Sequence, residues 1–227
     1  MNSKKNFRFY FIYLLILISI SITSIFSLVE ERETSKVHHD GGNIFTLADL
    51  PVKCNDNEVL THWQLIEKNN YISIKYNCIY HSSVSYESEE KFTDWNSVNK
   101  DIRKSLNFLD RHRLVCDHGF AIGAFRMEKS GNTIRFRYRC NKITPVSSSD
   151  RRTSWENSNF GEVQKLSIHS IYGSSLKSDN QVLRGWVMKT KYENRWCTLF
   201  CDSYHYIKFE IFYDTLAEKT KMDFSDN

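Results

Sequence analysis

The sequence contains little proline and glycine, and its net charge is small. Among 227 residues there are 2 prolines and 8 glycines, which excludes collagen-like and proline-rich proteins. A formal charge of +4 is too mild for a dedicated nucleic-acid-binding domain, so we expect no nucleic acid as a partner. No Asn-x-Ser/Thr sequon is present. The hydrophobic content of 41%, with 14% aromatic residues, is nevertheless sufficient for a folded core.

A long uncharged stretch at residues 9–29 follows the basic residues Lys4, Lys5 and Arg8. A basic flank before an apolar run is typical of a secretory signal. The run also reaches the roughly 20 residues that are needed to span a bilayer. A cleaved signal peptide and a membrane-spanning type II signal anchor therefore both stay open for residues 1–29. Both place the remainder in the secretory pathway, either outside the cell or at its surface.

The six cysteines are interpreted as disulfides, because a translocated chain meets an oxidising compartment. Zinc binding is the alternative, but no Cys-x-x-Cys pair exists. Cys197 and Cys201 form the only close pair, and no partner pair lies at zinc-finger spacing. We therefore predict no metal and no other cofactor.

The sequence repeats itself. The segments CNDNEVLTHWQLIEKNNYISIKYNC (54–78) and CDHGFAIGAFRMEKSGNTIRFRYRC (116–140) both run from cysteine to cysteine over 24 positions. A third, divergent copy begins at Gln181 and lacks the flanking cysteines. Apolar residues recur at matching positions of the three copies: Leu60, Ile122 and Leu183; Trp63, Phe125 and Trp186; Leu65, Met127 and Met188; Ile74, Phe136 and Phe209. Such internal repetition indicates a repeat architecture with a unit of about 60 residues.

Each copy is predicted to form a β-hairpin. The segments YISIKY and TIRFRY alternate strictly between apolar and polar residues, as a half-buried strand does. The intervening EKNN and KSGN are turn-like. Antiparallel strands bring their outer ends together, so we predict the disulfides Cys54–Cys78 and Cys116–Cys140. Cys197 and Cys201 are then left to pair locally.

These elements predict an all-β fold in which three tandem hairpin repeats form a pseudo-three-fold, β-prism-like or trefoil-like domain over residues 51–214. A six-stranded sandwich is the alternative. Residues 30–50 are polar with a glycine pair, which favours a linker or stalk. Residues 215–227 are expected to form a charged tail that frays.

The repeats resemble the dermatopontin family of secreted proteins. The resemblance covers about residues 52–213 and is carried by CNDNEVLTHW with YNC, by CDHGFAIGAF with YRC, and by ENRW at 193–196. The first two repeats lack that family's D-R-x-W signature, and fewer cysteines are present. The resemblance implies a disulfide-bonded β protein that acts as an adhesive or glycan-binding extracellular module without catalysis.

Three arginines share one face of the strand TIRFRYR: Arg135, Arg137 and Arg139 alternate with apolar residues and are spaced about 7 Å apart. Arg126 lies nearby in the sequence. Because guanidinium groups recognise carboxylate, sulfate and phosphate through paired donors, these residues are a candidate site for an anionic glycan or an acidic protein surface. The alternative is a solvated face that discourages strand-to-strand aggregation.

Other residues are weaker candidates for chemistry. Trp95 and Trp155 lie in polar spacers, where they are candidates for stacking on sugar rings, although packing is the default role of such side chains. Asp110 and His112 invite an acid–base interpretation, but no nucleophile accompanies them in a recognised frame. We therefore expect no enzyme, and a hydrolase is the least favoured alternative.

We accordingly predict a secreted or surface-anchored binding or adhesion module. The competing class is a structural one, a coat or matrix component that works by self-association.

Overall fold

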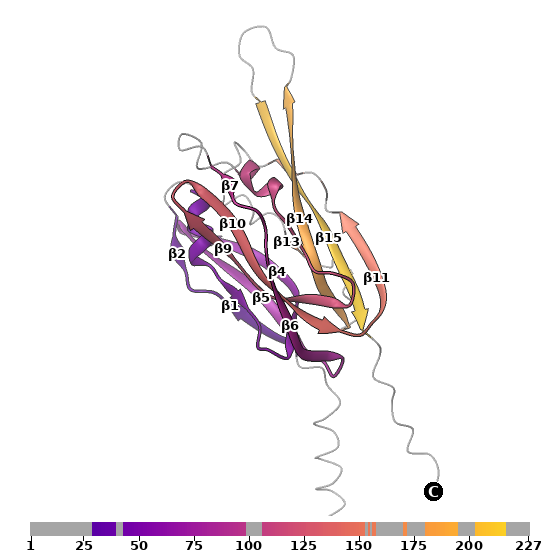
Figure 1. Ribbon diagram of the computed structural model, residues 1–227. Coiled ribbons are helices and arrows are strands. Elements are labelled where there is room, and N and C mark those ends of the chain that lie inside the picture. Colours follow the sequence, from indigo (N-terminus) through magenta and orange to yellow (C-terminus); the bar gives the residue numbers. More distant parts are fainter. Residues whose placement is uncertain are drawn as a thin grey trace, which may run out of the picture.

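The computed structural model describes residues 29–39, 43–98, 106–152, 154, 156–157, 170–171, 180–194 and 203–216. Within these ranges the protein is mostly β, with three antiparallel sheets and two short 3₁₀ helices. The predicted all-β class is therefore confirmed. Three sheets form instead of the two sheets of a sandwich (Figure 1).

Each sheet is built on one of the predicted hairpins. The hairpins define sheets A, B and C, and their strands are β4 (Glu58–Lys68) with β5 (Tyr71–Tyr80), β9 (Phe120–Ser130) with β10 (Thr133–Ile143), and β14 (Gln181–Asn194) with β15 (Ser203–Leu216). In the first hairpin Asn69 and Asn70 both have positive φ, as a tight type I′ turn requires. Gly131 has positive φ in the second hairpin.

The outer strands of each sheet pair with the second strand of its hairpin. They are β1 (Val29–Glu33) and β2 (Val37–His38) in sheet A, β6 (Val84–Phe92) and β7 (Asn96–Ser97) in sheet B, and β11 (Pro145–Arg152) and β12 (Glu156–Asn157) in sheet C. In each case these strands precede their hairpin in the chain. The same order of elements therefore occurs three times.

One short strand of each set crosses to a different sheet. Strand β3 (Val52–Lys53) precedes the hairpin of sheet A but pairs with β9 of sheet B. In the same way β8 (Arg113–Val115) pairs with β14, and β13 (Ser170–Ile171) pairs with β4. The strand before the hairpin of sheet A joins sheet B, the one before the hairpin of sheet B joins sheet C, and the one before the hairpin of sheet C joins sheet A. Each sheet therefore contains one short strand that belongs in the chain to another hairpin.

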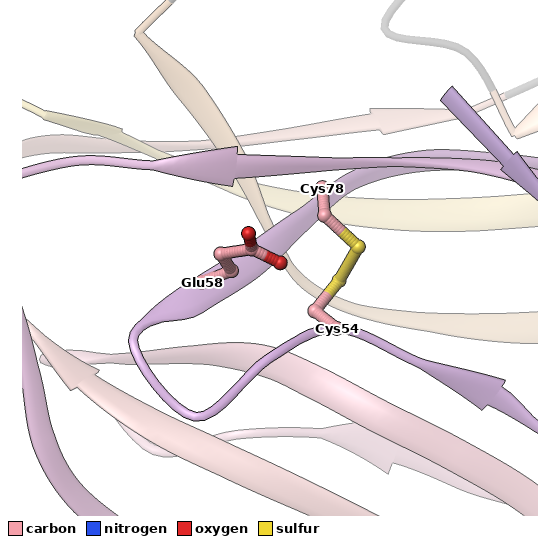
Figure 2. A group of neighbouring side chains, drawn as sticks. All are labelled: Cys54, Glu58 and Cys78. Atoms are coloured by element: carbon pink, nitrogen blue, oxygen red, sulfur yellow. A yellow bond between two sulfur atoms is a disulfide. The ribbon is translucent and has the colours of Figure 1, made fainter. Parts of the chain in front are cut away.

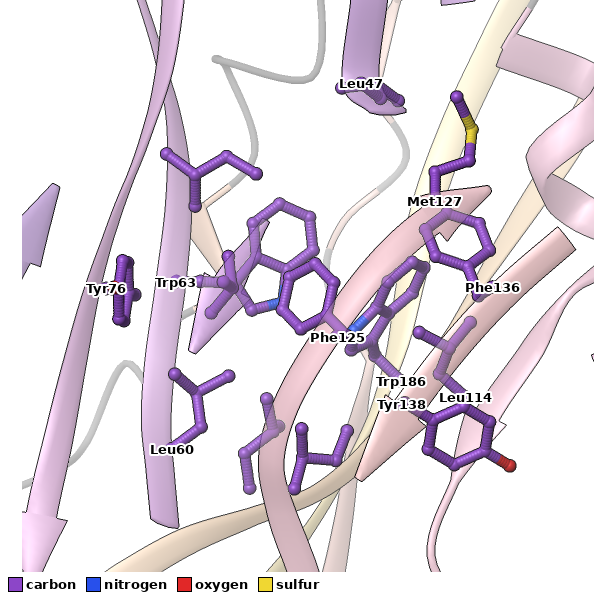
Figure 3. Close-up of a cluster of buried hydrophobic side chains, with 14 of the residues drawn as sticks. Leu47, Leu60, Trp63, Tyr76, Leu114, Phe125, Met127, Phe136, Tyr138 and Trp186 are labelled. Carbon is purple, nitrogen blue, oxygen red and sulfur yellow. The ribbon is translucent and has the colours of Figure 1, made fainter. Parts of the chain in front are cut away.

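Aromatic side chains from all three sheets meet in the core. The rings of Trp63 and Trp186 lie 5.4 Å apart, and Trp63 lies 5.4 Å from Phe125 (Figure 3). Phe136 and Phe209 pack edge-on against Trp186. Trp63 and Trp186, which occupy matching positions of the repeats, are both buried. The cluster also receives side chains from helices η1 (Ile44–Asp49) and η3 (Leu106–Arg111).

The register of the hairpins agrees with the repeat alignment. Each hairpin contains one irregularity at the same place, between the positions of Leu60 and His62, Ile122 and Ala124, and Leu183 and Gly185. The aligned apolar residues are buried in all three copies.

The predicted linker at residues 30–50 is wrong where the structure describes it. Residues 29–33 form β1, which pairs with β5, and residues 44–49 form η1. Glu33 accepts a hydrogen bond from Ser73, and Arg32 lies 2.9 Å from the Glu58 carboxylate. Strand β1 is polar because four of its five side chains are exposed at the edge of sheet A, so it lacks the apolar alternation of a half-buried strand. Strand β15 likewise continues to Leu216, inside the predicted tail.

Candidate functional site

The structure brings all four predicted arginines together on the outward face of sheet B. Arg135, Arg137 and Arg139 alternate along β10 with the buried residues Ile134, Phe136 and Tyr138, as predicted. Arg126, on β9, lies directly opposite Arg137 in the register.

Three of these arginines are paired with glutamates. Glu128 lies 2.8 Å from Arg126 and 2.8 Å from Arg135, so one carboxylate serves two guanidinium groups. Arg137 donates from Nε to Glu90 on β6 at 2.5 Å. Like charges directly opposite each other destabilise a sheet. The two glutamates offset that repulsion and hold the side chains in fixed positions.

Arg139 has a structural role. Its guanidinium lies 2.5 Å from Asp56 and donates to the backbone carbonyls of Cys54 at 2.9 Å and Asn55 at 3.0 Å. These contacts hold the loop between β3 and β4 against β10. Three of the donors of Arg139 are thereby committed within the protein.

A groove of about 320 Å³ lies between β3 and β6 on this face. Its lining includes Ala124, a small residue on a face of long side chains, together with Lys53, Arg126, Arg137 and Glu90. Lys53 lies opposite Ala124 in the register and is exposed. Its ammonium group has no ion-pair partner among the described residues. The groove is thus bordered by three cationic groups that retain free donors.

An aromatic shelf, formed by Phe92 and Trp95, adjoins the groove. Both rings are exposed. The Arg135 guanidinium lies 4.3 Å from the Phe92 ring centre and 4.5 Å from that of Trp95, which is cation–π geometry. Because Glu128 holds Arg135, the shelf is fixed beside the groove.

Sheet A provides an internal comparison for the ion pairs. Lys75 occupies the register of Arg137 and contacts Glu31 at 3.3 Å, just as Arg137 contacts Glu90. This pair fastens an outer strand to the hairpin in both sheets, which supplies a structural reason for Arg137.

Arg126 and Arg139, by contrast, have no cationic counterpart in sheets A and C. Gln64 and Val187 occupy the register of Arg126 in sheets A and C. Asn77 and Phe212 occupy that of Arg139. Because Arg139 holds the loop before β4, Arg126 is the basic side chain at the groove that the repeated fold does not require.

The candidates for acid–base chemistry are engaged separately. The imidazole of His112 is fully buried, and its Nδ1 lies 2.7 Å from Thr93 Oγ1. Burial, with a smaller contribution from Arg111, lowers the pKa of His112 to about 4, against the opposing effect of Asp110 and Asp94. Asp110 accepts a hydrogen bond from Thr190. Because the His112 side chain is fully buried, it is not accessible to a substrate.

The side chains of Cys54, Glu58 and Cys78 lie close together in the geometry of a metal site (Figure 2). The two sulfur atoms are joined in a disulfide, so neither is a thiolate ligand. The Glu58 carboxylate accepts hydrogen bonds from Asn55 and Arg32. This cluster is therefore structural: it ties β1 and the loop before β4 to the first hairpin.

Two of the predicted disulfides are confirmed. Cys54 bonds to Cys78, and Cys116 bonds to Cys140, each over 24 positions. Each bridge links the short exchanged strand to the hairpin that follows it in the chain.

Three predictions fall outside the described residues: the pairing of Cys197 with Cys201, the stacking role of Trp155, and the signal segment before Val29. Among the residues that the structure describes, no helix has the length and apolar character needed to cross a membrane.

Sequence reasoning missed Lys53, Phe92, Glu90 and Ala124 as members of the site. They belong to β3 and β6, which were not assigned as strands, and to a β9 position that carries no charge. Only the pairing of these strands places them beside the arginines.

Searches against family models, curated proteins and solved structures found no match for the chain.

Proposed function

We propose that this protein is an extracellular binding module that takes an anionic saccharide on the outward face of sheet B. The groove bordered by Lys53, Arg126 and Arg137 carries the proposal. A carboxylate or sulfate over Ala124 would meet donors from two guanidinium groups and an ammonium group. Glu90 is the competing internal acceptor, so binding would have to draw Arg137 partly away from it.

The aromatic shelf favours a saccharide over a small inorganic anion. Phe92 and Trp95 lie beside Arg135, two residues along the strand from Arg137 and thus about 7 Å away. One sugar unit spans a similar length, so an acidic unit in the groove would place its neighbour over the shelf. Sugar rings have apolar faces that stack on exposed aromatic rings.

The compartment supports this proposal. Two buried disulfides are compatible with an oxidising, extracellular location. We propose that residues 9–29 direct the chain into the secretory pathway, where anionic glycans are available. We also propose that the three sets of strands are related by pseudo-three-fold symmetry, with the site present in only one of them.

Glycan binding by the full chain, produced in an oxidising host, tests the proposal. An array of sulfated, carboxylated and neutral glycans identifies the ligand, and calorimetry gives its Kd. We expect Arg126→Ala and Lys53→Ala each to weaken binding about tenfold, because a charge-assisted hydrogen bond is worth about 1.5 kcal/mol or more. The combined variant should abolish measurable binding, and added salt should weaken that of the unsubstituted protein.

Lys75→Ala is the matched control, because it removes a half-exposed cation of sheet A at the register that corresponds to Arg137. It should leave Kd unchanged. If the Lys53→Ala and Arg126→Ala variants bound the glycan with the same Kd as the unsubstituted protein, the proposed site would be wrong. Concentration-dependent oligomers without any glycan binding would instead favour the self-assembling structural class.

A further inference from the structure

We call the end of the domain at which β1 begins the β1 end (Figure 1). Aliphatic side chains from all three sheets meet there. They form a second buried cluster, separate from the aromatic core: Val59, Ile79, Val84, Ala121, Ile143, Val182 and Leu216. Because this cluster lies at the start of β1, β6 and β11 and at the finish of β5, β10 and β15, it marks one face of the molecule.

Exposed apolar side chains surround this cluster. Val29 is 39% exposed, Tyr80 46%, Tyr86 78% and Val146 63%. Among the described residues only three other large hydrophobic side chains are comparably exposed, and two of them form the aromatic shelf.

Each of the four is adjacent to the cluster in strand register. Val29 lies opposite Ile79, and Tyr80 follows Ile79 in β5. Tyr86 lies two residues after the cluster residue Val84 in β6. Val146 follows the residue that pairs with Leu216.

The charged groups of the β1 end are mostly paired with one another. Lys142 contacts Glu87 at 2.7 Å, and Lys91 contacts Asp117 at 2.6 Å. Arg32 contacts Glu58 and Glu30. This face therefore presents apolar and aromatic groups without an excess of positive charge.

The sequence before β1 indicates what covers this face. The uncharged run at residues 9–29 ends at Val29, which is itself the first residue of β1. No polar linker separates the run from the folded domain. Strand β1 is fixed to sheet A by backbone pairing with β5 and by the Arg32–Glu58 contact. A bilayer that retained the run would thus lie against the β1 end.

We infer that the β1 end docks on the headgroup region of a zwitterionic bilayer in which residues 9–28 are retained. Tyrosine suits this position because its ring enters the interface while its hydroxyl stays hydrated. Because the charged groups of this face are mostly paired with one another, docking does not require an anionic lipid. This inference is independent of the proposed saccharide site, which lies on the side of the domain.

The full chain in phosphatidylcholine proteoliposomes tests the inference. A phospholipid with a photoactivatable group near the glycerol backbone is crosslinked to the protein, and peptide mass spectrometry maps the attachment sites. We expect domain crosslinks at the peptides that contain Tyr80, Tyr86 and Val146. The combined Tyr80→Ser and Tyr86→Ser variant should lose most of them, at least about fivefold.

Tyr71→Ser is the matched control, because Tyr71 is a similarly exposed tyrosine at the hairpin turn, the opposite end of β5 from Tyr80. It should leave the crosslink map unchanged. Intact disulfides and an unchanged melting temperature establish that each variant is folded. The map of the unsubstituted protein decides the question even if a variant fails to fold.

Crosslinks confined to residues 9–28, or spread evenly over the domain, would overturn the inference. A requirement for anionic lipid would also contradict it. So would a mature amino terminus near residue 28 on the exported protein, because no apolar segment would then remain.

Discussion

The strongest quantitative prediction concerns His112, whose ring is buried between the end of η3 and Phe136. Its Nδ1 lies 2.7 Å from the hydroxyl of Thr93, which also accepts a hydrogen bond from the Phe136 amide. A neutral imidazole fits these surroundings, whereas an imidazolium would be buried without a carboxylate in contact. Protonation of His112 should therefore favour the unfolded chain.

The magnitude follows from the two pKa values. The pKa of His112 is about 4 in the folded protein, compared with 6.5 for the unfolded chain. Between these values the unfolded state binds more protons, so stability falls as the pH decreases from 6.5 to 4. A difference of about 2.5 pH units corresponds to about 3 kcal/mol of unfolding free energy. This contribution is complete above pH 6.5 and is lost by pH 4.

Denaturant unfolding of the protein and of His112→Phe, at pH 7 and pH 4, measures this contribution. The phenyl ring preserves most of the volume but cannot titrate. We expect the unsubstituted protein to lose about 3 kcal/mol more than the variant over this interval. The difference isolates His112 from other groups such as His62, whose pKa is also lowered by burial. Equal losses in both proteins, or an NMR titration of His112 near pH 6.5, would refute the reasoning.

Three further changes test the architecture by denaturant unfolding at pH 7. Replacing Cys54 and Cys78 together by serine should reduce stability by about 3.5 kcal/mol, because the bridge then no longer restricts a loop of 24 residues in the unfolded chain. No loss of stability would show that the bridge does not form. Gly185→Ala should destabilise by about 1–3 kcal/mol, because its Cβ would lie 2.5 Å from the Cα of Val115 in the exchanged strand; a neutral effect would contradict this close packing. Trp186→Ala should remove about 3–5 kcal/mol from the aromatic core, and a loss below about 1 kcal/mol would argue against the observed packing.

Much of the β framework could be predicted from residue spacing. The cysteine pairs, the turns at Asn69 and Gly131, and the buried residues of the hairpins follow from local patterns. An alternating pattern reports the pleat of a strand, and equal spacing between cysteines reports equal hairpin length. Neither signal requires knowledge of where the other sheets lie.

The polar edge strands could not be predicted in this way. The segment that contains β1 has the composition of a linker, because nearly all side chains of β1 are exposed at the sheet edge. The two-residue strands β3 and β13 are too short to show any period. Their pairing with a neighbouring sheet is decided by which backbone groups remain free after the hairpins pack together.

The candidate site shows the same division. The sequence alone determined that Arg135, Arg137 and Arg139 share one face of a strand, because side chains alternate along it. Only the tertiary structure decided what each guanidinium contacts. Arg137 meets Glu90 from 47 positions away, and Arg139 meets the Cys54 carbonyl from 85 positions away. Periodicity acts over a few residues, whereas these contacts depend on how distant strands come to lie side by side. The pairing of distant strands therefore decides that Arg139 holds a loop, whereas Arg126 and Arg137 border an open groove.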